Sequence, residues 1–392
     1  MKNNFRTLTS AILTKTSALF AKKDEVYTKE EAASKEDLGN AVDTHDHPYL
    51  QYRHIRATLP SSENWLSVTY GNGKFVAVDN GYTGSGGSKV AAYSEDGVTW
   101  AQSTLPVKDY WQSVAYGNGK FVAVATGSGS SGSATAAYSE DGVTWTQSTL
   151  PLSQLWRSVT YGNGKLVAVA TGSRGSKVAA YSEDGVTWAQ STLPVKDYWQ
   201  SIAYGNGKFV AVASSSTTAA YSEDGINWTQ TTLPSSQLWR SVTYGNGKFV
   251  AVASSSTTAA YSEDGINWTQ TTLPSSENWY SVAYGNGKFV AVSASGSATA
   301  AYSEDGVTWA QSTLPLSQFW RSVTYGNGKF VAIANGCVDV AYSKDGITWL
   351  DTYSELVQDG CTITPDQLGL ATESYVDDII GQAILGAMEA SY

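Results

Sequence analysis

A sevenfold internal repeat constrains this chain more than any other feature of its sequence. The tetrapeptide Tyr-Gly-Asn-Gly occurs seven times, at intervals of 40 to 46 residues, and an Asp-Gly-x-x-Trp segment follows each copy in phase. The 14 tryptophans divide into two sets of seven: one set ends the Asp-Gly-x-x-Trp segments, and the other precedes each Tyr-Gly-Asn-Gly by five residues. Such self-similarity predicts one supersecondary unit per repeat.

Each repeat has room for four short strands. In the first repeat they are predicted at residues 65–70, 74–78, 91–94 and 98–102, which are rich in β-branched and aromatic residues. Asn72-Gly73 and Asp96-Gly97 separate the strands of each pair, and both dipeptides are typical of type I′ hairpin turns. Because one such sheet cannot bury both faces, the sheets must stack around an axis. We therefore predict an all-β, seven-bladed β-propeller of four-stranded blades, with short helical N- and C-terminal arms.

Three segments follow from this pattern: an N-terminal attachment arm at residues 1–52, the propeller at 53–353 and an acidic C-terminal arm at 354–392. Thr-Leu-Pro ends every internal repeat and also precedes the first one, at Thr58–Pro60. Residues 56–59 are therefore one candidate for closing the ring beside the last blade. The last repeat also keeps a candidate fourth strand of its own at residues 347–351, so both alternatives stay open.

Composition excludes several classes of partner. A net charge of −10 and a pI near 4.8 argue against binding to nucleic acid. The sequence has no apolar run long enough for a membrane span, and no signal peptide is expected. Two cysteines, Cys337 and Cys361, are too few for a disulfide scaffold. Free thiols, or one bridge joining the C-terminal arm to the last repeat, are the two alternatives.

Comparison of the repeats with one another predicts a constant face and a variable face. The two hairpin turns hardly change, whereas the loop between the second and third strands and the connection between blades vary. Such variation is typical of a recognition surface, and equally of a surface that tolerates change. The candidate ligand-binding residues are Lys108, Asp109, Tyr110, Lys196, Asp197, Tyr198, Arg157, Arg240, Arg321, Asn64 and Asn278. Aromatic rings beside polar groups favour a sugar ligand, and packing between blades is the alternative role.

Catalysis is not expected. Almost every polar residue recurs several times around the predicted ring, the seven repeats contain no histidine, and a catalytic site needs an asymmetric set of groups. Arg157, Arg240 and Arg321 occupy equivalent positions in repeats three, five and seven, so we expect them to be spread around the ring. We predict a protein that is not an enzyme and needs no cofactor.

The two arms differ from the repeats. Phe5, Ile12, Leu19, Val26 and Ala33 are spaced by seven residues, which favours a helical stalk or a plain surface helix. His45 and His47 lie two residues apart, so in a trimer three such pairs would offer six nitrogens to iron or another transition metal. A polar turn is the alternative. Residues 376–387 carry an apolar stripe at helical spacing, which predicts a helix that docks or oligomerises.

Several segments resemble known families. Ser94–Trp100 resembles the Asp-box turn of sialidase-like propellers, one residue shorter than the usual form, and the whole repeat is similar to propellers of phage and bacterial surface proteins. Residues 44–50 and 370–377 are similar to segments of phage tail fibres. This resemblance implies a virion protein of the phage tail, extracellular when assembled and oligomeric, with a trimer favoured. Its N-terminal arm would bind other tail proteins, and its propeller would bind a host-surface glycan or protein. A structural collar or baseplate decoration, or a cellular lectin or adhesin, are the alternatives.

Overall fold

The computed structural model describes residues 51–81, 86–358 and 361–362, which form strands, turns and loops. The chain divides into two compact units, Arg56–Tyr353 and a second unit that combines Met1–Ile55 with Ser354–Tyr392. Within the described ranges there is no helix, and hence none that could span a membrane. The predicted helical arms, and His45 and His47, lie outside the described residues.

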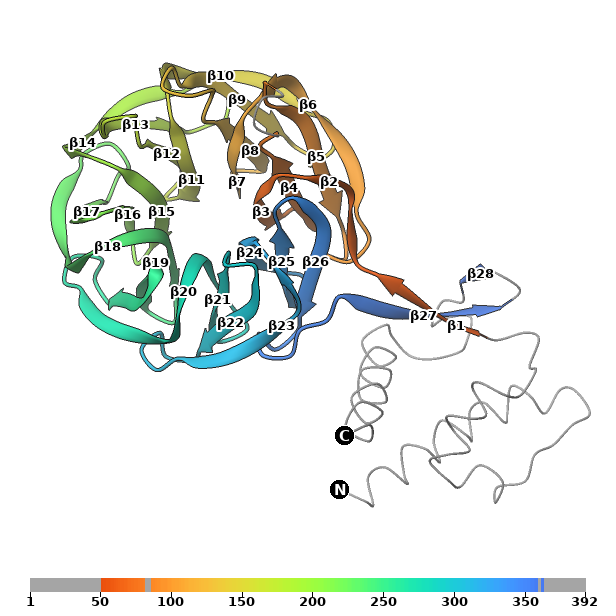
Figure 1. Cartoon of the computed structure of the whole chain (residues 1–392). Coiled ribbons are helices and arrows are strands. Elements are labelled where there is room, and N and C mark those ends of the chain that lie inside the picture. The colour runs from red at the N-terminus through yellow and green to blue at the C-terminus, as the bar shows by residue number, and fades with distance from the viewer. Residues whose placement is uncertain (1–50, 82–85, 359–360, 363–392) are drawn as a thin grey trace, which may run out of the picture. The chain divides into compact units, whose positions relative to one another are not determined.

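The repeats fold into a ring of antiparallel sheets, with the first strand of each repeat nearest the centre (Figure 1). The inner strands are β3 (Trp65–Gly71), β7 (Trp111–Gly117), β11 (Trp156–Gly162), β15 (Trp199–Gly205), the second parts of β18 (Thr229–Gly245) and β20 (Thr269–Gly285), and β24 (Trp320–Gly326). The second strands are β4 (Lys74–Asp79), β8 (Lys120–Ala125), β12 (Lys165–Ala170), β16 (Lys208–Ala213), the first part of β19 (Lys248–Ser262), β21 (Lys288–Ser293) and β25 (Lys329–Ala334).

The outer half of each sheet completes a four-stranded blade. The third strands are β5 (Ser88–Ser94), β9 (Ser133–Ser139), β13 (Ser176–Ser182), β17 (Ser216–Ser222), the last part of β19, β22 (Ser297–Ser303) and β26 (Cys337–Ser343). The outer strands are β6 (Ala101–Asp109), β10 (Thr146–Gln154), β14 (Ala189–Asp197), the first parts of β18 and β20, β23 (Ala310–Gln318) and β2 (Thr58–Glu63). Three further strands, β1 (Gln51–Arg56), β27 (Thr352–Gln358) and β28 (Cys361–Thr362), form a separate sheet.

The fourth strand of each repeat begins later than predicted. In the first repeat it runs from Ala101 to Asp109 rather than over residues 98–102. Val98 and Thr99 belong instead to the turn, because both of their amides donate to Oδ1 of Asp96 at 2.7 Å. The Asp96-Gly97 dipeptide is therefore not a type I′ turn: Gly97 alone has a positive φ, of 76°. Asn72 and Gly73 do form the predicted turn, with φ of 46° and 74°.

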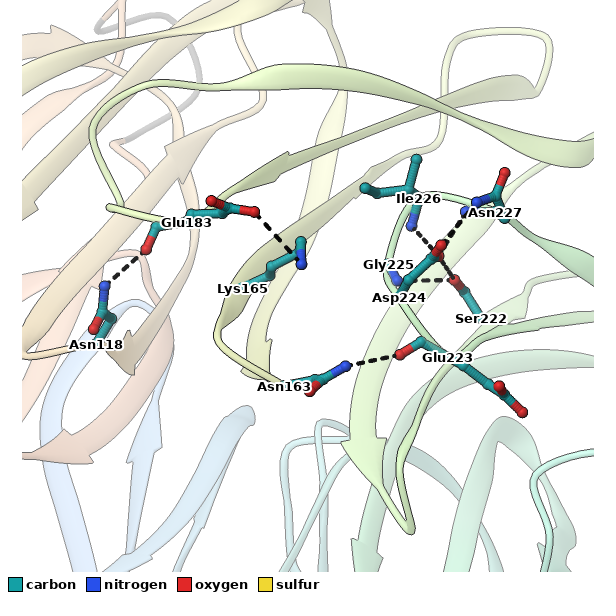
Figure 2. A network of polar contacts seen from close by, with 10 residues as sticks. All are labelled: Asn118, Asn163, Lys165, Glu183, Ser222, Glu223, Asp224, Gly225, Ile226 and Asn227. Atoms are coloured by element: carbon teal, nitrogen blue, oxygen red, sulfur yellow. Dashed lines mark hydrogen bonds and ion pairs between the residues drawn. The ribbon is translucent and has the colours of Figure 1, made fainter.

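The Asp-box-like turns hold their own shape through one carboxylate. In the fourth repeat, Asp224 accepts hydrogen bonds from the amides of Ile226 and Asn227 and from the Ser222 hydroxyl, as Figure 2 shows. The Ser222 hydroxyl in turn accepts the amide of Gly225. The same bonds recur in all seven repeats, so these aspartates are structural.

Two cycles of hydrogen bonds join each repeat to the next. The Asn163 side chain donates to the carbonyl of Glu223 in the following repeat at 3.1 Å (Figure 2). Equivalent bonds form a series around the ring, and the last of them runs from the Asn327 side chain to the carbonyl of Glu95 in the first repeat. Nearer the axis, the Ser67 hydroxyl accepts the amide of Val114, and the last such bond runs from Val68 back to Ser322. Because both series return to the first repeat, the ring is closed.

The N-terminal segment of the ring unit closes it. β2 pairs with β26, with Thr58 opposite Asp339 and Glu63 opposite Cys337, so the predicted use of this segment is confirmed. Residues 347–351 do not form the alternative full strand: only Leu350 pairs with Tyr342, and Asp351 then accepts the amide of Ala57. The outer strand of the last blade is therefore a composite of both ends of the ring unit.

The core lies between blades rather than within them. The tryptophans that lie five residues before each Tyr-Gly-Asn-Gly, which we call the first-set tryptophans, are fully buried: Trp65, Trp111, Trp156, Trp199, Trp239, Trp279 and Trp320. Each packs with valines, alanines and, in most repeats, a phenylalanine of two adjacent repeats; Trp111, for example, contacts a cluster that contains Val76, Leu105 and Phe121. Burial of this much apolar surface across every blade boundary stabilises the ring as a whole.

Acid should weaken the fold through the Asp-box-like turns. Partial burial raises the pKa of Asp184, but hydrogen bonds from the amides of Thr187 and Val186 outweigh it and hold the pKa at about 2. The corresponding aspartates of the other six repeats also have lowered pKa values. Since an unfolded aspartate has a pKa of about 3.9, their contribution is complete above about pH 4 and is lost as the pH falls towards 2.

We therefore expect the melting temperature, followed by circular dichroism, to fall steeply between pH 4 and pH 2.5. Asp184→Asn should lower stability at pH 7 and reduce the change below pH 4. A melting temperature that stays constant from pH 5 to pH 2.5 would contradict this role of the turns.

Candidate functional site

A β-bulge at the start of every inner strand sets the chemistry of the ring's centre. In β3, Trp65 pairs with Asp79 and Ser67 with Val78, so Leu66 is an extra residue in the ladder. The same register shift follows the first tryptophan of every other repeat. A bulge redirects a side chain, and here it presents one residue per repeat to the axis. We call these the axial residues: Leu66, Gln112, Arg157, Gln200, Arg240, Tyr280 and Arg321.

The axial residues line a single pocket of about 110 Å³. The serines that follow them contribute the rest of its lining. The pocket lies at the beginning of the inner strands, where each one meets the end of the second strand, as Trp65 meets Asp79. It therefore opens towards the end of the blades that carries the variable segments. We call this end the variable face; it comprises the loops after the second strands, such as residues 126–132 and 171–175, and the connections before the first-set tryptophans.

Positive charge converges in this pocket without a matching carboxylate. Arg157, Arg240 and Arg321 all line it, no aspartate or glutamate does, and among the described residues none of the three arginines forms a salt bridge. Their Nε atoms are buried and have no hydrogen-bond partner in the described part of the chain. Arg157 donates from Nη1 to Gln112 Oε1 at 3.2 Å. The site thus gathers three arginines around one small volume, each with a buried Nε that has no partner in the described structure.

Tyr280 orders two of these arginines. The guanidinium carbon of Arg321 lies 4.4 Å from the centre of the Tyr280 ring, and that of Arg240 lies 5.7 Å from it. Such cation–π contacts contribute about 0.5–2 kcal/mol each. Burial lowers the pKa of Arg157, Tyr280 opposes the shift, and the positive charges of Arg240 and Arg321 add to it. The arginines are therefore electrostatically coupled.

A ring of larger side chains precedes the axial residues in the chain. The residue directly before each first-set tryptophan lies two positions from an axial residue, and we call these the rim residues: Asn64, Tyr110, Leu155, Tyr198, Leu238, Asn278 and Phe319. Tyr198, Leu238 and Phe319 are 43%, 38% and 50% exposed. The cationic pocket is thus accompanied by exposed aromatic and apolar groups.

The candidate ligand residues fall into two groups: the three arginines line the axial pocket, and the others, which we call the outer candidates, do not. Tyr198 is exposed, Tyr110 is partly buried, and Lys108 and Lys196 are exposed near them. Lys196 also lines a second, shallow pocket formed mainly by residues 130–131, 153–155 and 172–175. These outer candidates lie on the variable face and do not line the axial pocket.

Four of the outer candidates hold loops in place. Asp109 accepts the Tyr110 amide and the Ser133 hydroxyl, and Asp197 makes the same two kinds of bond. Asn64 donates to the carbonyl of Gly81, and Asn278 accepts from the Ser254 and Ser255 hydroxyls. Their polar groups are thus largely occupied within the protein.

The expectation that the three arginines are spread around the ring was wrong. They come from alternate repeats, but the bulges place them next to the axis, where all inner strands converge. Gln112, Gln200 and Tyr280 complete the same pocket and were missed from the sequence. The signal that identifies them is the residue directly after each first tryptophan, which varies between repeats while its neighbours stay constant.

Among the residues for which side chains are described, Cys337 is a free thiol, and burial raises its pKa to about 11. It is therefore protonated and unreactive at neutral pH. No cluster of three or more His, Cys, Asp or Glu residues suited to a metal ion occurs in that part of the chain.

Comparison with known proteins identifies the class of fold. No family model and no curated protein matches the chain. Virginiamycin B lyase from Staphylococcus aureus aligns with 79% of this chain and 99% of its own, with a TM-score of 0.62 and 11% identity. YCF48 bound to D1 peptide covers 78% and 99% (TM-score 0.55, 16% identity), and the WD40 β-propeller domain of Doa1 covers 75% and 99% (0.53, 14%). At these identities the likeness shows the fold alone: a β-propeller with four-stranded blades.

The comparison corrects the prediction that the chain is not an enzyme. A lyase has this fold, so a ring of repeated blades does not exclude catalysis. The symmetry argument was also wrong in its physics. Equivalent positions of the repeats meet at the axis with different side chains, and the resulting pocket is asymmetric.

Proposed function

We propose that this chain is an attachment protein of a phage tail, whose propeller binds a host-surface receptor, most simply a glycan, through the variable face. One observation carries the proposal: the segments that differ between otherwise near-identical repeats gather at the end of the ring where the axial pocket opens. The exposed rim residues Tyr198, Leu238 and Phe319 supply surface for stacking on sugar rings. The likeness of residues 44–50 and 370–377 to tail-fibre segments supports the virion location and an oligomeric, trimeric assembly.

The proposal includes a ring of seven blades. Seven sequence repeats, and a serine-to-amide cycle that passes once through each of them, support this count. The four-stranded sheets and the nine-stranded sheet, in which β18 and β20 each serve two neighbouring blades, fit the same number. Projection images along the axis with six or eight sectors would overturn it.

Adsorption competition tests the function directly. Purified protein added to host cells before infection should reduce phage adsorption in a dose-dependent manner, because it occupies the receptor. Tyr198→Ala with Phe319→Ala should weaken this block about tenfold or more, since stacking on an aromatic ring contributes about 1.4 kcal/mol. Lys165→Ala, on the opposite end of the blade, is the matched control. Undiminished adsorption at saturating protein favours a collar or baseplate decoration.

A further inference from the structure

We propose that the axial pocket binds one oxyanion, a carboxylate, sulfate or phosphate group carried by the receptor, between Arg157, Arg240 and Arg321. The inference deepens the attachment function and rests on it for the origin of the ligand. The binding chemistry itself rests on the geometry of the pocket alone.

The arginines are built into the site and do not serve the fold. The same position holds Leu66, Gln112, Gln200 and Tyr280 in the other repeats, and the strand and its bulge are unchanged there. Arginine is therefore not needed to make a blade. Three like charges brought to one point repel one another, and an anion removes this repulsion.

Donor geometry favours an oxyanion over other ligands. A guanidinium presents planar N–H donors that match the oxygens of carboxylate, sulfate and phosphate. Arg157, Arg240 and Arg321 all line the pocket, and their buried Nε atoms have no partner in the described structure. Gln112 and Gln200 add side-chain amides to the same lining. Tyr280 acts as a positioning residue, because its ring lies against both Arg240 and Arg321.

Size limits what enters the pocket. Its volume is about 110 Å³. Sites for whole small molecules typically enclose about 300–1,000 Å³. A charged group therefore enters, while the sugar that carries it stays outside, within reach of the rim residues. The protein as a whole has a net charge of −10. The axial pocket instead gathers positive charge, which favours the binding of an anion there.

Isothermal titration with inorganic sulfate and phosphate, in low-salt chloride buffer, tests the proposal on the full chain. We expect saturable binding of one ion per ring. Arg321→Gln should weaken binding about tenfold or more, because one charge-assisted hydrogen bond is lost. The fold tolerates glutamine at this position, as Gln112 and Gln200 show. Lys165→Gln, at the opposite end of the blade, also removes one positive charge; it is the matched control and should leave the affinity unchanged.

A gain-of-function variant covers the case in which Arg321→Gln fails to fold. Gln200→Arg adds a fourth arginine to the pocket and should strengthen sulfate binding several-fold. Absence of saturable binding to the wild type, or equal affinity in wild type, Arg321→Gln and Gln200→Arg, would overturn the site. Polygalacturonate, a carboxylate polymer, should compete with sulfate if the anion comes from a polysaccharide; failure to compete assigns the site to a free ion.

Failure of this site is distinguishable from failure of the attachment function. If the protein blocks phage adsorption and Arg157→Gln/Arg240→Gln/Arg321→Gln blocks it equally well, the attachment function stands and the oxyanion site falls. If sulfate binds but wild-type protein does not block adsorption, the site stands and the attachment function falls.

Discussion

Arg56→Ala should lower the free energy of unfolding by about 3 kcal/mol, because it leaves a carboxylate buried without its counter-charge. Arg56 Nη2 lies 2.8 Å from Asp339 Oδ1, and the Asp339 side chain is only 6% exposed. The amide of Gln318 donates to its other oxygen at 2.6 Å. Arg56, the last residue of β1, lies two residues before the closing strand β2, and Asp339 lies on β26 of the last blade, so loss of this ion pair should weaken the closure of the ring. Denaturant unfolding followed by tryptophan fluorescence measures the change.

A rescue variant separates closure from general damage. Asp339 occupies the position of Val90 and Val178 in other repeats, as the pairing of each with a Thr-Leu-Pro threonine shows. Arg56→Ala/Asp339→Val should therefore recover most of the lost stability, since a well-packed apolar pair replaces a buried ion pair at little cost. Arg174→Ala is the control for removal of an exposed arginine. If Arg56→Ala is as stable as this control, the ion pair does not hold the ring closed.

Gly162→Ala should destabilise the protein by at least about 3 kcal/mol, because it overpacks a blade boundary. A Cβ at Gly162 would lie 1.9 Å from the ring of Tyr204 in the next repeat, and equivalent close approaches occur at each corresponding glycine. Tyr204 in turn packs on Phe209, with 4.8 Å between ring centres, so it has little room to move. Thermal and denaturant melts measure the loss.

Gly164→Ala, in the same turn, is the matched comparison. No atom lies within 4 Å of a Cβ there, but the φ of Gly164 is +75°. Only backbone strain of about 1 kcal/mol is expected. Equal losses for the two variants would show that the conformation of the turn, rather than the contact with Tyr204, accounts for the effect at Gly162.

Periodicity predicted most of the fold, because each blade repeats the same local signals. The Tyr-Gly-Asn-Gly turns and the first two strands lie where the sequence predicted them. The fourth strand was placed too early, because Val98 and Trp100 have the residue types of a strand. The Val98 amide instead donates to Asp96 in the turn, and the strand begins only after Trp100, at Ala101. Apolar character alone does not reveal a side-chain carboxylate that competes for backbone amides.

The candidate site was predicted only in part. Arg157, Arg240 and Arg321 were identified as candidates. Because they occupy equivalent positions in different repeats, however, they were expected to lie far apart around the ring. What matters is the distance from the axis, and this depends on a bulge that no local propensity encodes. The roles of Asp109 and Asn64 in holding loops were likewise invisible, since their partners, such as Ser133 and Gly81, lie in segments of irregular length.

The hydrogen bonds between repeats recur unchanged, whereas the axial residue differs from repeat to repeat. This difference has a consequence for variation in this protein. Residues 205–236 and 245–276 are identical in sequence, so the corresponding stretches of the gene are natural sites for recombination. Exchange of one repeat for another keeps the two recurring series of hydrogen bonds to its neighbours and replaces the axial side chain in the pocket. Loss or gain of a repeat, in contrast, leaves β2 facing a ring of the wrong circumference. Exchange of repeats can therefore change the lining of the axial pocket one side chain at a time while the number of repeats stays fixed.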